Sequence, residues 1–150
     1  MTISLRSEPT ITFQYLSFAL TTLDEENLLT THCERSGLTT LGDITVVLTG
    51  DVPIDDVLHQ DPRYVFVQSD DVDHAFDKRV SPIVRIQLKD LAMRNQLAIS
   101  DVEKAKLQDI VSRTHTAGRL LHVTGIPKFP MHEREIVKDS LRSSGVDYVS

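Results

Sequence analysis

Residues 44–49 of this 150-residue chain read Ile44-Thr45-Val46-Val47-Leu48-Thr49, and this run decides the fold class. The run lies between Gly42 and Gly50, and every side chain in it is apolar or β-branched. A run without polar alternation is typical of a strand covered on both faces, as in a parallel sheet. Residues 64–67, Tyr-Val-Phe-Val, repeat the pattern. We therefore expect two buried strands here.

Helix-like segments alternate with strand-like segments on both sides of this run. Apolar residues at spacings of three and four predict a helix that starts at Pro9, with Phe13, Leu16, Leu20 and Leu23 on its apolar face. Ser100 and Glu103 match a capping box, and Gly118 matches a helix C-cap. The expected buried stripe of that helix is Val102, Leu107, Ile110, Val111 and Thr114. A last helix is expected over residues 131–141, with Met131, Ile136, Val137 and Leu141 facing inward.

Further short strands are expected at residues 2–6, 28–33, 82–86, 120–123 and 146–149. Strands that alternate with helices predict an α/β protein with a mostly parallel sheet. A closed (β/α) barrel needs about 250 residues. The chain is therefore expected to be a single domain over residues 1–150, either an open doubly wound sheet or part of a barrel.

Composition excludes several classes of function. Lys and Arg number 16 against 22 Asp and Glu, for a net charge of -6, and no basic cluster is present, which argues against nucleic-acid binding. No apolar run approaches the ~20 residues of a transmembrane segment. No secretory signal or mitochondrial presequence is recognisable, so the compartment stays undefined, with the cytoplasm as default. The one cysteine, Cys33, excludes an intramolecular disulfide and is interpreted as a structural thiol.

Candidate site residues follow the strands, because ligands of parallel sheets bind at the carboxyl ends of the strands. Arg6 ends the first strand and could bind an anionic group or reach solvent. His122 lies on a predicted buried strand, where a satisfied core histidine and a site histidine are the two interpretations. Asp70, Asp71 and Asp73 could hold a divalent cation or be simply solvated. The six histidines, among them His74, show no metal-ligand spacing.

Several short motifs follow one another in a familiar order. They are Thr49 to Pro53, His115 to Gly118, the segment Ile126-Pro127-Lys128-Phe129-Pro130, Arg134, and Gly145-Val146-Asp147. This order resembles that of the altered inheritance of mitochondria protein 6 family. That family is a fungal branch of the phospholipase C-like phosphodiesterases, which are related to glycerophosphodiester phosphodiesterases.

The resemblance implies an α/β fold, namely an incomplete TIM-type (β/α) barrel made of the C-terminal β/α units of a phosphoric diester hydrolase of lipid metabolism. In such enzymes two histidines act as base and acid, and carboxylates hold a divalent cation, Mg²⁺ or Ca²⁺. Those motifs would precede Met1, so no catalytic and no metal-binding residue is assigned to this sequence, no cofactor is expected in it, and we expect no turnover.

The resemblance assigns substrate binding to Arg6 and His122, which stand where the family has a lysine and an arginine. The expected ligand is a phosphodiester small molecule or a lipid headgroup. Two alternatives stay open. One is a non-catalytic interaction module that self-associates through the exposed sheet edge of an unclosed barrel. The other is an unrelated doubly wound α/β domain.

Overall fold

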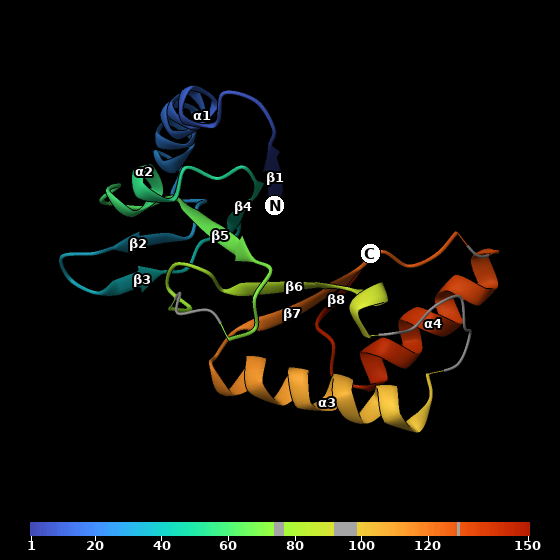
Figure 1. Ribbon diagram of the computed structural model, residues 1–150. Helices are drawn as coiled ribbons and strands as arrows, with labels where there is room; N and C mark the ends of the chain where they lie inside the picture. The colour runs from blue at the N-terminus through green and yellow to red at the C-terminus, as the bar shows by residue number, and fades with distance from the viewer. Residues whose placement is uncertain (74–76, 92–98, 129) are drawn as a thin grey trace. The chain divides into compact units, whose positions relative to one another are not determined.

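The computed structural model describes residues 1–73, 77–91, 99–128 and 130–150. His74 and Phe129, which entered the sequence analysis, lie outside the described residues. The chain divides into two compact units. The first unit comprises residues 1–68 and 79–81, and the second comprises residues 69–78 and 82–150. Figure 1 shows strands and helices in each of them.

The first unit contains the neighbouring parallel strands β1 (Thr2–Leu5), β4 (Val46–Gly50) and, except for its last residue, β5 (Val65–Ser69). Two helices, α1 (Pro9–Asp24) and α2 (Ile54–Leu58), follow β1 and β4. The prediction of buried strands is confirmed, because Val46, Val47 and Leu48 are at most 3% exposed. The buried core residues are Leu5, Phe13, Leu20, Leu29, Val46, Leu48, Val57, Tyr64, Val65 and Val67.

A small hairpin belongs to the same unit. Strands β2 (Thr31–Cys33) and β3 (Leu38–Thr40) pair antiparallel. The expected strand over residues 28–33 is thus shorter, and β3 was not expected at all. All three side chains of β3 are exposed, so the strand carries no apolar periodicity that a pattern could reveal.

The second unit has strands β6 (Ile83–Gln87), β7 (Leu120–Thr124) and β8 (Tyr148–Val149), which pair in parallel in that order. A short 3-10 helix, η1 (Leu88–Leu91), follows β6. Helices α3 (Asp101–Thr116) and α4 (Met131–Ser143) connect the strands, and Figure 1 shows them in gold and orange-red. The core is formed by Val84, Leu88, Leu91, Leu107, Ile110, Val111, Leu121, Val123, Val137, Leu141 and Val146.

The structure confirms the capping box at the start of α3. The Ser100 side chain accepts a hydrogen bond from the backbone N–H of Glu103, and the Glu103 carboxylate accepts one from the backbone N–H of Ser100. The prediction that Val102, Met131 and Ile136 face inward is wrong. Val102 is 81% exposed, Met131 82% and Ile136 53%. Each helix buries one stripe only, and these three lie outside it, in or beside the first two turns.

The predicted α/β class with parallel strands is confirmed in both units. Each contains a set of parallel strands whose connections include helices. Within the described ranges, no helix is both long enough and apolar enough to cross a membrane.

Candidate functional site

The strands of the second unit have one apolar face and one polar face. On β7, Leu121 and Val123 are fully buried in the core, whereas His122 between them and Thr124 after them are only partly buried. On β6, Val84 is fully buried. Successive side chains of a strand point to opposite faces, so the residues between the core positions share the other face.

Strand register places three polar side chains in one row on that polar face. Arg85 of β6 is the register partner of His122 of β7, which is in turn the partner of Tyr148 of β8. Gln87 and Thr124 form the next row toward the carboxyl ends of the strands. A cation, an imidazole and a phenol therefore stand side by side, and we call Arg85, His122 and Tyr148 the polar row.

A carboxylate holds Arg85 in place. Arg85 donates from Nε to Asp70 Oδ1 at 2.9 Å and from Nη2 to Asp70 Oδ2 at 2.7 Å. Such a two-point pair fixes the plane of a guanidinium better than a single ion contact does. The Asp70 side chain is 65% exposed and that of Arg85 33% exposed, so solvent reaches the pair. A dissolved oxyanion can compete for the same guanidinium.

His122 contacts residues of β8 and of the chain end. Its Nε2 lies 3.0 Å from Ser150 Oγ, and its ring meets Tyr148 edge-on at 6.2 Å between centroids. Burial lowers the pKa of His122, and the charge of Arg85 lowers it further. The imidazole is therefore neutral at physiological pH, with one nitrogen donating and the other accepting. A neutral imidazole beside a guanidinium suits recognition of a singly charged oxyanion.

The two residues predicted to bind substrate lie in different units. Arg6 is exposed and follows β1 in the first unit, while His122 lies on β7 in the second. Each is therefore described within its own unit.

Two of the three candidate cation ligands, Asp70 and Asp73, bind arginines. Asp70 pairs with Arg85, and both carboxylate oxygens of Asp73 accept from Arg113 Nη1, at 2.7 and 2.9 Å. Among the residues that the structure describes, no group of three or more His, Cys, Asp or Glu side chains could hold a metal ion. The ion that the resemblance implies therefore finds no fitting set of ligands in these ranges, and no chemical step is assigned to it.

Sequence reasoning missed Arg85 and Tyr148 as members of a site, and it considered Asp70 only as a ligand for a divalent cation. A signal was available, because residues 83–87 and 120–124 both alternate apolar and polar positions over part of their length. Such alternation indicates a strand with one exposed face. Residues 120–123 were predicted to form a buried strand. The polar His122 among their apolar residues indicates the exposed face.

The described polar row thus combines an oriented guanidinium, a neutral imidazole and an exposed aromatic ring. The chain was compared with protein-family models, with curated proteins and with solved structures, and none of them matches it.

Proposed function

We propose that the polar row binds the phosphodiester group of a small molecule or of a lipid headgroup. The observation that carries this proposal is the register that puts Arg85 directly beside His122 on a partly exposed sheet face. The guanidinium offers charge-assisted donors to the anionic oxygens. The neutral imidazole adds a hydrogen bond without adding charge. A phosphodiester carries one negative charge, which one guanidinium balances.

This proposal includes a fold assignment finer than the α/β class. We infer an incomplete TIM-type barrel built from the C-terminal β/α units of a phospholipase C-like phosphodiesterase. The parallel order of β6, β7 and β8 supports it, as do the helices between these strands. In such barrels one strand face is packed against helices and the other faces the barrel interior, where ligands bind at the carboxyl ends of the strands.

Binding is proposed here without hydrolysis. The resemblance assigns the chemistry to a pair of histidines and to metal-binding carboxylates, and it assigns neither to residues of this sequence. The polar row contains one imidazole, whose Nε2 contacts Ser150. We expect glycerophosphocholine to bind without being cleaved, even when Mg²⁺ or Ca²⁺ is added.

Asp70 competes with the ligand in this proposal. Its carboxylate occupies two donors of Arg85 that a phosphodiester would use. Because the Asp70 side chain is largely exposed, releasing it to water costs little free energy. Asp70→Asn should therefore bind the ligand more tightly than the unaltered chain, by a factor of about two to five.

Calorimetric titration with glycerophosphocholine tests the proposal. Arg85→Gln should lose binding, and Asp70→Asn should gain it. Asp73→Asn is the matched control, since Asp73 pairs with Arg113 in the same unit and is similarly exposed. A second arm uses phosphatidylcholine vesicles, which separates recognition of a free molecule from recognition of a membrane lipid. Equal affinity of the unaltered chain and Arg85→Gln would refute the proposed role of the polar row.

A second candidate function is self-association through a sheet edge, as in an interaction module. It is favoured by the position of β1 as an end strand of the sheet, with Thr2 and Ser4 exposed. End strands present backbone donors and acceptors to a further strand. Sedimentation velocity of the chain and of a Ser4→Pro variant tests this candidate. Proline blocks an edge strand, so the variant should be monomeric at concentrations where the unaltered chain is dimeric.

A further inference from the structure

Two buried basic side chains meet in the first unit. His32 of β2 and Arg63, which precedes β5, are each 1% exposed. Their backbones exchange two hydrogen bonds, from His32 N–H to the Arg63 carbonyl at 2.9 Å and from Arg63 N–H to the His32 carbonyl at 2.8 Å. The main chain therefore holds the two residues opposite each other.

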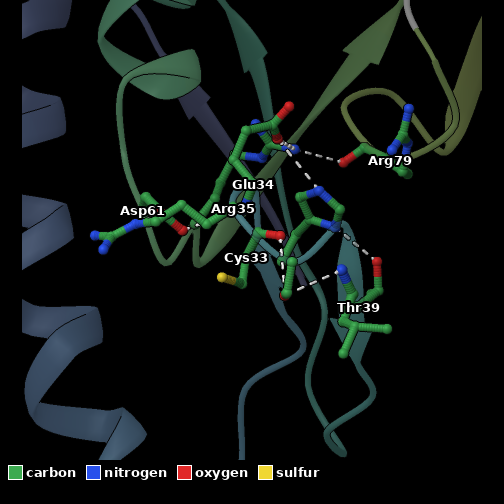
Figure 2. Close-up of polar contacts among 10 residues, drawn as sticks. Cys33, Glu34, Arg35, Thr39, Asp61 and Arg79 are labelled. Carbon is green, nitrogen blue, oxygen red and sulfur yellow. Dashed lines mark hydrogen bonds and ion pairs between the residues drawn. The ribbon is translucent and has the colours of Figure 1, made fainter.

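The neighbours of these side chains fix which nitrogen atoms remain available. Thr39 Oγ1 lies 2.8 Å from His32 Nδ1, and Figure 2 shows Thr39 on the adjacent β3 strand. If the threonine hydroxyl donates to Nδ1, then Nε2 carries the proton and is a donor. Arg63 donates from Nη2 to the carbonyl oxygen of Arg79 at 3.0 Å. Burial lowers the pKa of Arg63, and the charge of Glu34 opposes that shift.

Two donor nitrogens of this pair have no hydrogen-bond acceptor among the described residues. They are His32 Nε2 and Arg63 Nε, and both are buried. A buried donor without an acceptor costs free energy, typically about 1–3 kcal/mol. Two such donors on one pair of side chains indicate a place where an acceptor is expected to bind.

Among the described residues, Glu34 has a carboxylate that forms an ion pair with both side chains. Its Oε2 lies 3.2 Å from His32 Nε2 and 3.6 Å from Arg63 Nη2, so it balances charge without completing a hydrogen bond to either nitrogen. The Glu34 side chain is 61% exposed. Its backbone is anchored, because Glu34 N–H donates to Asp61 Oδ1 at 3.1 Å and the neighbouring Arg35 donates from Nε to Asp61 Oδ2 at 2.9 Å (Figure 2). The carboxylate can thus leave toward solvent while the backbone stays in place.

We propose that His32 and Arg63 form an oxyanion-binding site in which the Glu34 carboxylate is a resident and displaceable occupant. The ligand is a small oxyanion, a phosphate or a carboxylate, whose oxygen atoms accept from His32 Nε2 and from the Arg63 guanidinium. Both ligands share the charged oxygen acceptors that Glu34 itself offers. This site lies in the first unit and is independent of the proposed function of the polar row.

The test uses inorganic phosphate and sodium acetate as probes, each matched in ionic strength by sodium chloride. Binding is followed through the ring nitrogen resonances of His32 in the full chain, in an Arg85→Gln background that removes the other proposed anion site. We expect saturable shifts with at least one of the two probes, and the probe that binds identifies the class of oxyanion. Failure of the polar row to bind glycerophosphocholine leaves this result unaffected, so the two proposals fail separately.

Glu34→Gln is the decisive variant, because it keeps the shape of the occupant and removes its charge. It should bind the oxyanion more tightly than the parent by a factor of about two to five, as expected when a partly exposed ion pair no longer competes. Glu26→Gln, an exposed carboxylate in the same unit, is the control and should leave the affinity unchanged. The proposal is overturned if chloride produces the same shifts as both probes, or if Glu34→Gln binds no more tightly than the parent.

Discussion

His115 and Asp147 meet across the second unit, with His115 Nε2 2.9 Å from Asp147 Oδ2. The same carboxylate oxygen accepts the backbone N–H of Leu121 at 2.7 Å. His115 lies in the last turn of α3, and Asp147 lies directly before β8. The Asp147 side chain therefore joins the end of α3 and the strand β7 to the start of β8. In the sequence analysis, His115 appears only as the first residue of the motif His115 to Gly118. The structure adds this specific acceptor.

Asp147→Ala should lower the free energy of unfolding by about 1–3 kcal/mol, because the N–H of the fully buried Leu121 loses its acceptor. Urea denaturation measures the change. Asp139→Ala is the control, since Asp139 pairs with Arg142 on the exposed surface of α4, and it should change stability by less than about 0.5 kcal/mol. Similar losses in the two variants would contradict the role assigned to Asp147.

Gly50→Ala should be more destabilising than Gly125→Ala. Both glycines have positive φ angles, 83° and 80°. A Cβ at position 50 would overlap the carbonyl oxygen of Leu5 on the neighbouring β1 strand, whereas a Cβ at position 125 would meet nothing within 4 Å. The backbone strain common to both variants costs about 1 kcal/mol, and the overlap adds to it at position 50 only. Thermal or urea unfolding of the pair measures the difference, and equal losses would show that β1 can move away.

Ser100→Ala should cost about 1 kcal/mol through loss of the capping box of α3. Hydrogen bonds from Ser100 also lower the pKa of Glu103, so the variant should bring that pKa back toward its ordinary value. Carbon-detected titration of the glutamates measures the pKa, and urea denaturation measures the stability. Ser112→Ala, an exposed site within the same helix, should not reduce stability. An unchanged Glu103 pKa in Ser100→Ala would contradict the capping geometry.

Stability should fall as the pH drops below about 6.5, in part because of His122. Burial and the charge of Arg85 lower the folded-state pKa of His122 below its ordinary value of about 6.5, so the unfolded chain binds its proton first. Protonation therefore favours unfolding between the unfolded and the folded pKa values, and the contribution of His122 is fully present at higher pH. His122→Gln should show a smaller loss of unfolding free energy between about pH 7.5 and about pH 5.5 than the parent. An identical pH dependence of the two proteins would show that the His122 pKa is not lowered.

Secondary structure was predictable wherever a local pattern carries it. The helix beginning at Pro9 and the one capped by Ser100 are both confirmed, because residues three or four apart are neighbours on a helix. The short β3 strand was missed, because its backbone pairs with β2 while all its side chains are exposed. The prediction that Met131 and Ile136 face inward was wrong. The buried residues of α4 are Val137 and Leu141, which pack in the core.

The candidate sites were predictable only in part. His122 was singled out from the sequence, and its role in substrate binding stays a prediction. Asp70 entered as a metal candidate, and the structure pairs it with Arg85 instead. The resemblance to phospholipase C-like phosphodiesterases also stays a prediction, which the binding experiments on the polar row address.

The sequence by itself determined the buried parallel strands, the capped helix α3 and the acidic charge balance, because each depends on residues close together in the chain or on composition alone. Only the tertiary structure decided that Arg85 stands beside His122 and that His32 faces Arg63. The physical reason is that register between strands far apart in sequence is set by the packing of the helices and loops that connect them. No local periodicity records which residues those connections bring together.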